Sequence, residues 1–86
     1  MLTPKEIAQR LSGALKIAVD NFGIKRWYLN GRLHREDGPA VECVNGSKAW
    51  YINGKLHRAD GPAIEYSDGR IEWWINDKFK RSEKMS

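Results

Sequence analysis

The sequence predicts a single α+β domain, in which an N-terminal helix packs on a twisted antiparallel β-meander of five or six strands. Three observations predict this fold class. Residues 1–23 have a helical apolar period, residues 24–80 alternate between apolar and polar side chains with turn dipeptides, and a long motif recurs after 23 residues. Residues 81–86 form a short basic tail, and at 86 residues the chain is one domain with a small core.

The N-terminal segment has the start signals of an amphipathic helix. Thr3 is a suitable N-cap, Pro4 suits the first helical position, and Glu6 completes a capping box. The apolar residues that recur three or four positions apart are Ile7, Leu11, Ala14, Leu15, Ala18 and Phe22. We expect this stripe to cover one face of the sheet, with Gly23 ending the helix. The alternative is a helix that docks on a partner or a membrane.

The repeat supplies the most specific pattern in the chain. Residues 27–40 read WYLNGRLHREDGPA, residues 50–63 read WYINGKLHRADGPA, and residues 73–79 begin the motif again. A fixed period of this length is typical of units that stack on their neighbours. Because a catalytic group is normally needed once, the duplicated His34, Asp37, His57 and Asp60 are predicted to be structural loop residues, with each imidazole stacked on the indole of its own repeat.

Two turn dipeptides predict the register of the sheet. A two-residue turn at Asn45-Gly46 would place Val41 opposite Trp50, and Asp68-Gly69 would place Ile64 opposite Trp73. This register predicts an apolar face beneath the helix, formed by Trp27, Leu29, Val41, Cys43, Trp50, Ile52, Ile64, Tyr66, Ile71, Trp73 and Ile75.

The opposite face carries large aromatics beside charges, which is typical of a recognition surface. We expect it to bind a partner through Arg26, Tyr28, Glu42, Tyr51, Glu65, Glu72 and Trp74. The alternative is that these aromatics only shield neighbouring strands.

Charge and residue types narrow the chemistry. The net charge is +4, but residues 24–77 are balanced, and the basic excess lies mainly in Lys78, Lys80, Arg81 and Lys84. These four side chains are candidates for contact with nucleic acid or another acidic surface. The single Cys43 excludes an internal disulfide and cannot by itself hold zinc, so we expect no metal and no cofactor. Acid–base chemistry by His and Asp would lack a nucleophile and a pocket, so we expect no enzyme.

The repeated sequence motif resembles the MORN repeat, a family in which Trp precedes a Gly-Lys-x-His stretch. It is also similar to repeats in proteins of bacteriophages and large DNA viruses. The resemblance implies an antiparallel meander that holds other molecules without chemistry of its own. With no apolar run long enough to span a membrane and no signal peptide, we expect a cytoplasmic location, in the host cell if the chain is viral.

These observations together predict a non-enzymatic protein-binding module. The leading hypothesis is a virus-encoded accessory protein that binds a host enzyme or defence complex and inhibits or redirects it. The alternative is a nucleic-acid-binding protein that uses the basic tail together with the exposed aromatics, because aromatic stacking beside a basic flank is how single strands are held.

Overall fold

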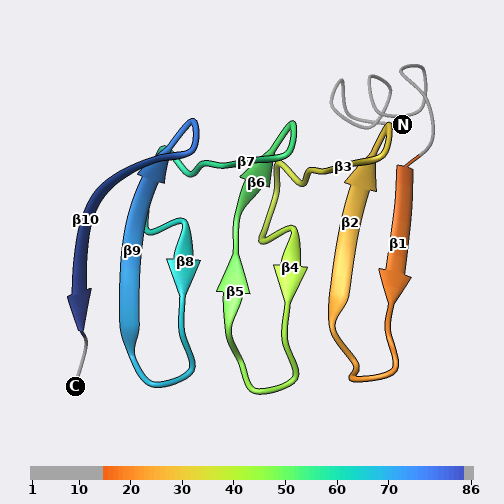
Figure 1. The fold of residues 1–86 in the computed structure, drawn as a ribbon, viewed down its shortest axis with the longest axis horizontal. Coiled ribbons are helices and arrows are strands. Elements are labelled where there is room, and N and C mark those ends of the chain that lie inside the picture. Colours follow the sequence, from red (N-terminus) through yellow and green to blue (C-terminus); the bar gives the residue numbers. More distant parts are fainter. Residues whose placement is uncertain (1–14, 85–86) are drawn as a thin grey trace.

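The computed structural model describes residues 15–84, which form a single layer of antiparallel strands (Figure 1). The strands are β1 (Leu15–Val19), β2 (Lys25–Leu29), β3 (Arg32–Leu33), β4 (Val41–Glu42), β5 (Lys48–Ala49), β6 (Tyr51–Ile52), β7 (Lys55–Leu56), β8 (Ile64–Glu65), β9 (Arg70–Ile75) and β10 (Lys78–Lys84). The main sheet has the order β1-β2-β4-β5-β8-β9-β10, with β3 paired to β2, and β6 and β7 form a separate hairpin. The meander predicted for residues 24–80 is therefore present.

The predicted helix is wrong where it can be compared. Within residues 15–84 the structure contains no helix, and Leu15–Val19 form β1, which pairs with β2 from Leu15 opposite Leu29 to Val19 opposite Lys25. The physical reason is a second period in the same residues: Leu15, Ile17 and Val19 alternate with Lys16 and Ala18, which suits a strand once a partner strand is available. The fold of the described residues is thus all-β. Residues 1–14, which include the predicted cap, lie outside them.

The predicted register is wrong by one residue. Cys43 N–H donates to the Ser47 carbonyl over 2.9 Å, and of the loop residues 44–46 only Gly46 has a positive φ, of 96°. This geometry is a three-residue turn, in which the Asn45 side chain accepts from Ser47 N–H over 2.9 Å. Val41 therefore pairs with Ala49, not with Trp50, and the next hairpin repeats the shift, because Ile64 pairs with Glu72.

A shift of one residue changes which side chains share a face. We call the side that carries Trp27, Trp50 and Trp73 the tryptophan face, and the side that carries Tyr28, Tyr51 and Trp74 the tyrosine face. Glu42 and Glu65 lie on the tryptophan face, contrary to prediction, and Val41 and Ile64 lie on the tyrosine face with Arg26 and Glu72.

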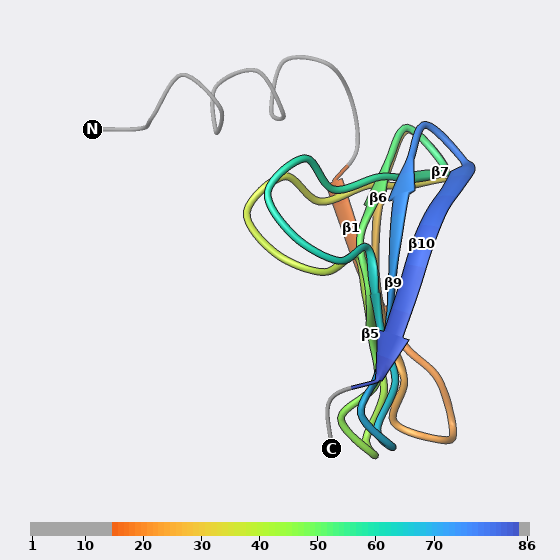
Figure 2. The ribbon, with the colours of Figure 1, turned by 90° about the vertical axis from the view of Figure 1, so that its left-hand side faces the viewer.

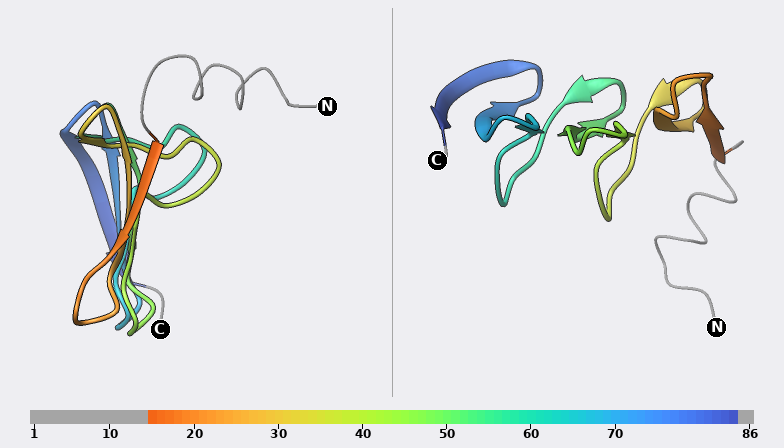
Figure 3. Two further views of the ribbon diagram at one scale, coloured as in Figure 1. Left: turned by 90° about the vertical axis from the view of Figure 1, so that its right-hand side faces the viewer. Right: turned by 90° about the horizontal axis from the view of Figure 1, so that it is seen from below.

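The predicted apolar core beneath a helix is not seen in residues 15–84. The buried residues of this part are Ala40, Ala63 and His34, and the tryptophans are half-buried. Figure 2 shows why, since the sheet is one layer thick and two loops project from the same side. Viewed from below, these loops lie next to each other (Figure 3). Stability must therefore come from contacts within and between repeats.

Candidate functional site

The first projecting loop is held by Arg35. Its guanidinium lies 4.0 Å from the centre of the Trp27 ring. Its Nη1 donates to the Pro39 carbonyl over 3.1 Å and to Glu42 Oε2 over 3.0 Å, and its Nε donates to Asp37 Oδ1 over 3.2 Å. One side chain thus ties both ends of the loop to the sheet, and cation–π contact fixes its position over the indole.

The second loop repeats this arrangement around Arg58. The guanidinium lies 3.9 Å from the Trp50 ring centre and donates to the Pro62 carbonyl over 3.0 Å. It also donates to Asp60 Oδ1 and Glu65 Oε2, each over 3.3 Å. The agreement between two loops of different surroundings shows that the repeated residues encode the loop geometry locally.

The repeated glycine of each loop makes room for the arginine. A Cβ added to Gly61 would lie 2.9 Å from Arg58 Cζ, and one added to Gly38 would lie 2.9 Å from Arg35 Cζ. Any larger residue would displace the guanidinium from its tryptophan. Glycine is therefore needed here because the arginine side chain lies close to its Cα. Backbone conformation is not the reason, since neither glycine is among those with a positive φ.

The histidines join consecutive repeats. His34 Nδ1 accepts from Asn53 N–H over 2.9 Å, and His57 Nδ1 accepts from Asn76 N–H over 3.1 Å. An accepting Nδ1 carries no proton, so both imidazoles act here as neutral acceptors. The predicted stacking of histidine on tryptophan is wrong, because Arg35 and not His34 covers Trp27. A structural role for His34, Asp37, His57 and Asp60 stays a prediction, which these hydrogen bonds support.

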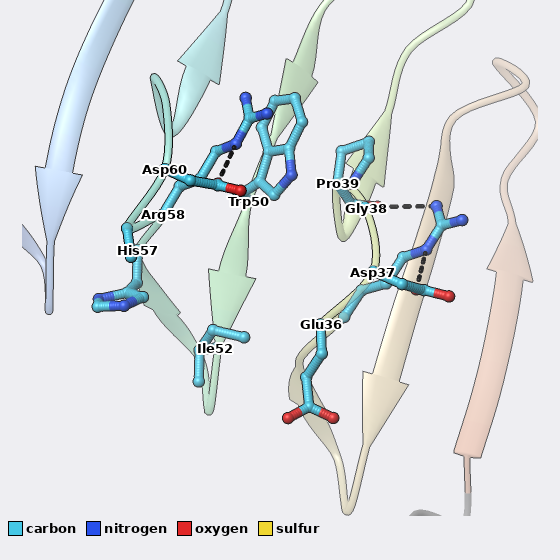
Figure 4. Close-up of a pocket in the computed structure, with 11 residues that line it drawn as sticks. Glu36, Asp37, Gly38, Pro39, Trp50, Ile52, His57, Arg58 and Asp60 are labelled. Atoms are coloured by element: carbon cyan, nitrogen blue, oxygen red, sulfur yellow. Dashed lines mark hydrogen bonds and ion pairs between the residues drawn. The ribbon is translucent and has the colours of Figure 1, made fainter. Parts of the chain in front are cut away.

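A groove lies between the two loops, with a volume of about 770 Å³ (Figure 4). Its floor is formed by Trp50 and Ile52 of the tryptophan face. Its walls are formed by Arg35, Glu36, Asp37, Gly38 and Pro39 from the first loop and by His57, Arg58, Ala59 and Asp60 from the second. Sequence reasoning missed this site, although the recurrence of Arg35 and Arg58 at the spacing of the tryptophans was a usable signal.

The rim of the groove is acidic. The side chains of Asp37 and Asp60 are 73% and 89% exposed, and Glu36 is also exposed. Each arginine is matched by two carboxylates, whereas Glu36 forms no ion pair within residues 15–84. The groove therefore combines an apolar floor with negative charge at its mouth.

The predicted partner surface is divided between the two faces. Glu42 and Glu65 are engaged by the loop arginines and do not lie beside the tyrosines. The other predicted members, Arg26, Tyr28, Tyr51, Glu72 and Trp74, share the tyrosine face.

Several of these tyrosine-face groups are already engaged. Arg26 pairs with Asp20 over 2.9 Å, Trp74 Nε1 donates to Glu72 Oε1 over 2.9 Å, and the Trp74 ring meets Phe79 edge-on at 5.5 Å. Burial raises the pKa of the Tyr51 phenol, and the Asp77 carboxylate raises it further. These contacts leave fewer free polar groups on this face than its composition indicates.

The predicted basic tail is mostly strand. Lys78, Lys80 and Lys84 are exposed on β10, but Arg81 lies 4.0 Å from the centre of the Trp73 ring and pairs with Glu83 over 3.0 Å. Arg81 thus takes the place of Arg35 and Arg58 in the third repeat. Three of the four basic residues remain candidates for an acidic surface.

Residues 15–84 contain no cluster of three His, Cys, Asp or Glu side chains suited to a metal ion. Nor does any helix of this part have the length and apolarity needed to cross a membrane.

Comparisons with known protein families, curated proteins and solved structures found no match to this chain. The resemblance to the MORN repeat stays a prediction that rests on the repeated residues themselves. The function is therefore argued from the groove and the two faces of the sheet.

Proposed function

We propose that this chain is a non-enzymatic protein-binding module and that the groove between its two loops is the binding site. The observation that carries the proposal is the apolar floor between the two loops, which consists of Ile52 and the part of the Trp50 ring that Arg58 does not cover. The loops themselves are held in place by arginine–tryptophan stacking. Binding sites with a central aromatic or aliphatic floor and a polar rim are typical of protein interfaces.

The charge of the rim indicates the chemistry of the partner. Glu36, Asp37 and Asp60 surround a floor that carries no free cation among the groove residues, since Arg35 and Arg58 are already paired. A segment with one apolar side chain between Lys or Arg residues satisfies both parts of the site. The resemblance of the repeat to viral repeats makes a host enzyme or defence complex the first class of protein to test, and binding would inhibit or redirect it.

A random peptide library tests the site while the partner is unidentified. Selection on the full chain should enrich peptides with an apolar residue flanked by Lys or Arg. Selected peptides should bind Glu36→Lys about tenfold more weakly and Ala59→Glu more tightly, because Ala59 faces the same groove from the second loop. Selection of acidic peptides, or equal binding by both variants, would contradict the proposal.

The second candidate function is nucleic-acid binding, favoured by the exposed Lys78, Lys80 and Lys84 on β10. A single-stranded oligonucleotide whose affinity falls steeply with added salt, and which is lost when these lysines are changed to serine, would support it. A partner that is retained at high salt and after nuclease treatment would support the protein-binding module.

A further inference from the structure

The strand at the N-terminal end of the sheet exposes an apolar row. Leu15, Ile17 and Val19 of β1 are 48%, 54% and 60% exposed and lie on one face, because they alternate along the strand. Single exposed apolar residues are common on protein surfaces, but these three are adjacent on a sheet edge and form a continuous apolar patch.

Among residues 15–84, the outer edge of β1 has no partner strand. β1 pairs with β2 on its inner side, and in the part of the chain that the structure describes no strand pairs with its other side. The opposite end of the sheet differs, since β10 carries Lys78, Lys80, Arg81, Glu83 and Lys84. Charged residues are the usual protection of an edge strand, and β1 has only Lys16.

We propose that two copies of this chain pair through β1 in antiparallel fashion, centred on Ile17. This register places Ile17 opposite Ile17 of the second copy, Leu15 opposite Val19, and Lys16 opposite Ala18. The sequence Leu-Lys-Ile-Ala-Val is thus self-complementary: every apolar residue of the exposed row meets an apolar residue, and the lysines never meet each other.

The symmetry of this pairing limits the assembly to two copies. A contact in which the same strand serves both partners is isologous and closes at a dimer, and the two sheets join into one continuous sheet. Self-pairing of β10 by contrast would bring lysines together. No residue that lines the groove belongs to β1, and β2 and β4 lie between β1 and β5, so the inference stands independently of the proposed function.

Sedimentation equilibrium of the full chain tests the proposal. A five-residue strand pair buries less than about 1,000 Å², so we expect a weak dimer whose mass rises from one to two chains between about 1 μM and about 1 mM. Ile17→Lys should remain monomeric across this range. Val44→Lys is the matched control, because Val44 is an apolar turn residue that is 76% exposed and lies outside the strand; it should dimerise like the parent.

The register has its own readout. In a Cys43→Ser background, Ile17→Cys should form a disulfide between two copies under mild oxidation, because residues on the two-fold axis are directly opposed. Ala18→Cys should not, because Ala18 would face Lys16. A chain that stays monomeric at about 1 mM, a dimer that survives Ile17→Lys, or equal cross-linking at both positions would overturn the proposal.

Discussion

The second and the third repeat both place an arginine over a tryptophan, but the chain around this pair differs between them. Arg58 lies 3.9 Å from Trp50, and Arg81 lies 4.0 Å from Trp73. The second repeat then forms a projecting loop, whereas the third continues as strand β10, with Lys84 where the complete repeat has Gly61. The arginine–tryptophan pair therefore does not need the loop. The loop instead supplies one wall of the groove, and the groove needs two such loops because it lies between them.

The largest expected effect is on stability, and it should differ between Trp50 and Trp73. Trp50→Ala should lower the free energy of unfolding by about 2–3 kcal/mol, somewhat less than a fully buried indole, because Trp50 is half-buried but holds Arg58 and the loop. Trp73→Ala should cost about 1–2 kcal/mol, because no loop depends on it. Urea denaturation measures both; equal losses would show that the loop contributes nothing to the stability of the stack.

The next effect tests why the loop contains glycine. Gly61→Ala should destabilise the fold by about 1–2 kcal/mol, because the new methyl group would push Arg58 away from Trp50. In an Arg58→Ala background the same change should cost less than about 0.5 kcal/mol. A penalty that persists in this background would mean that the glycine is required for another reason.

A smaller effect distinguishes the two histidines. His34→Ala should cost about 1–2 kcal/mol, because His34 is buried and accepts from a partly buried N–H. His57→Ala should cost about 0.5–1 kcal/mol, because the N–H of Asn76 is exposed and can bond to water instead. Thermal unfolding of the two variants gives the order, and the reverse order would contradict this account of how repeats join.

The smallest expected effect is on the stability of the fold at acidic pH, through the turn residues Asp68 and Asp20. The backbone N–H of Arg70, followed by its guanidinium, lowers the pKa of Asp68 below its ordinary 3.8, and the Arg26 side chain does the same for Asp20. Because these pKa values are lower in the folded chain, the stabilisation is present at neutral pH and is lost as the pH falls through and below 3.8. Asp68→Asn keeps the amide oxygen as an acceptor and should flatten the dependence of stability on pH in that range. An unchanged acid profile would show that Asp68 does not contribute to it.

The repeat predicted the meander and its period, because the turn residues and the tryptophans recur without interruption. It did not predict the register, since Asn-Gly suits both a two-residue turn and a three-residue turn whose last residue alone has positive φ. That shift moved Glu42 and Glu65 away from the tyrosines. The helix was wrong because Leu15–Val19 fit two periods, and only pairing with β2 decides between them.

The groove could not be predicted from local patterns. It depends on loops that lie side by side only after the sheet has formed, and on arginines whose partners are up to eight residues away along the chain. The duplicated Trp and Arg positions were visible, but their contact was not.

The most direct test of the groove uses the repeat as its own control. Ile52 lies on the groove floor, and Leu29 holds the same position one repeat earlier but does not line the groove. Affinity for a selected peptide or captured partner should fall about thirtyfold or more in Ile52→Lys, which places a cation on the floor, and should change less than about twofold in Leu29→Lys. Calorimetric titration of both folded variants measures this difference. Equal losses in the two variants, or full affinity in Ile52→Lys, would show that the groove is not the binding site.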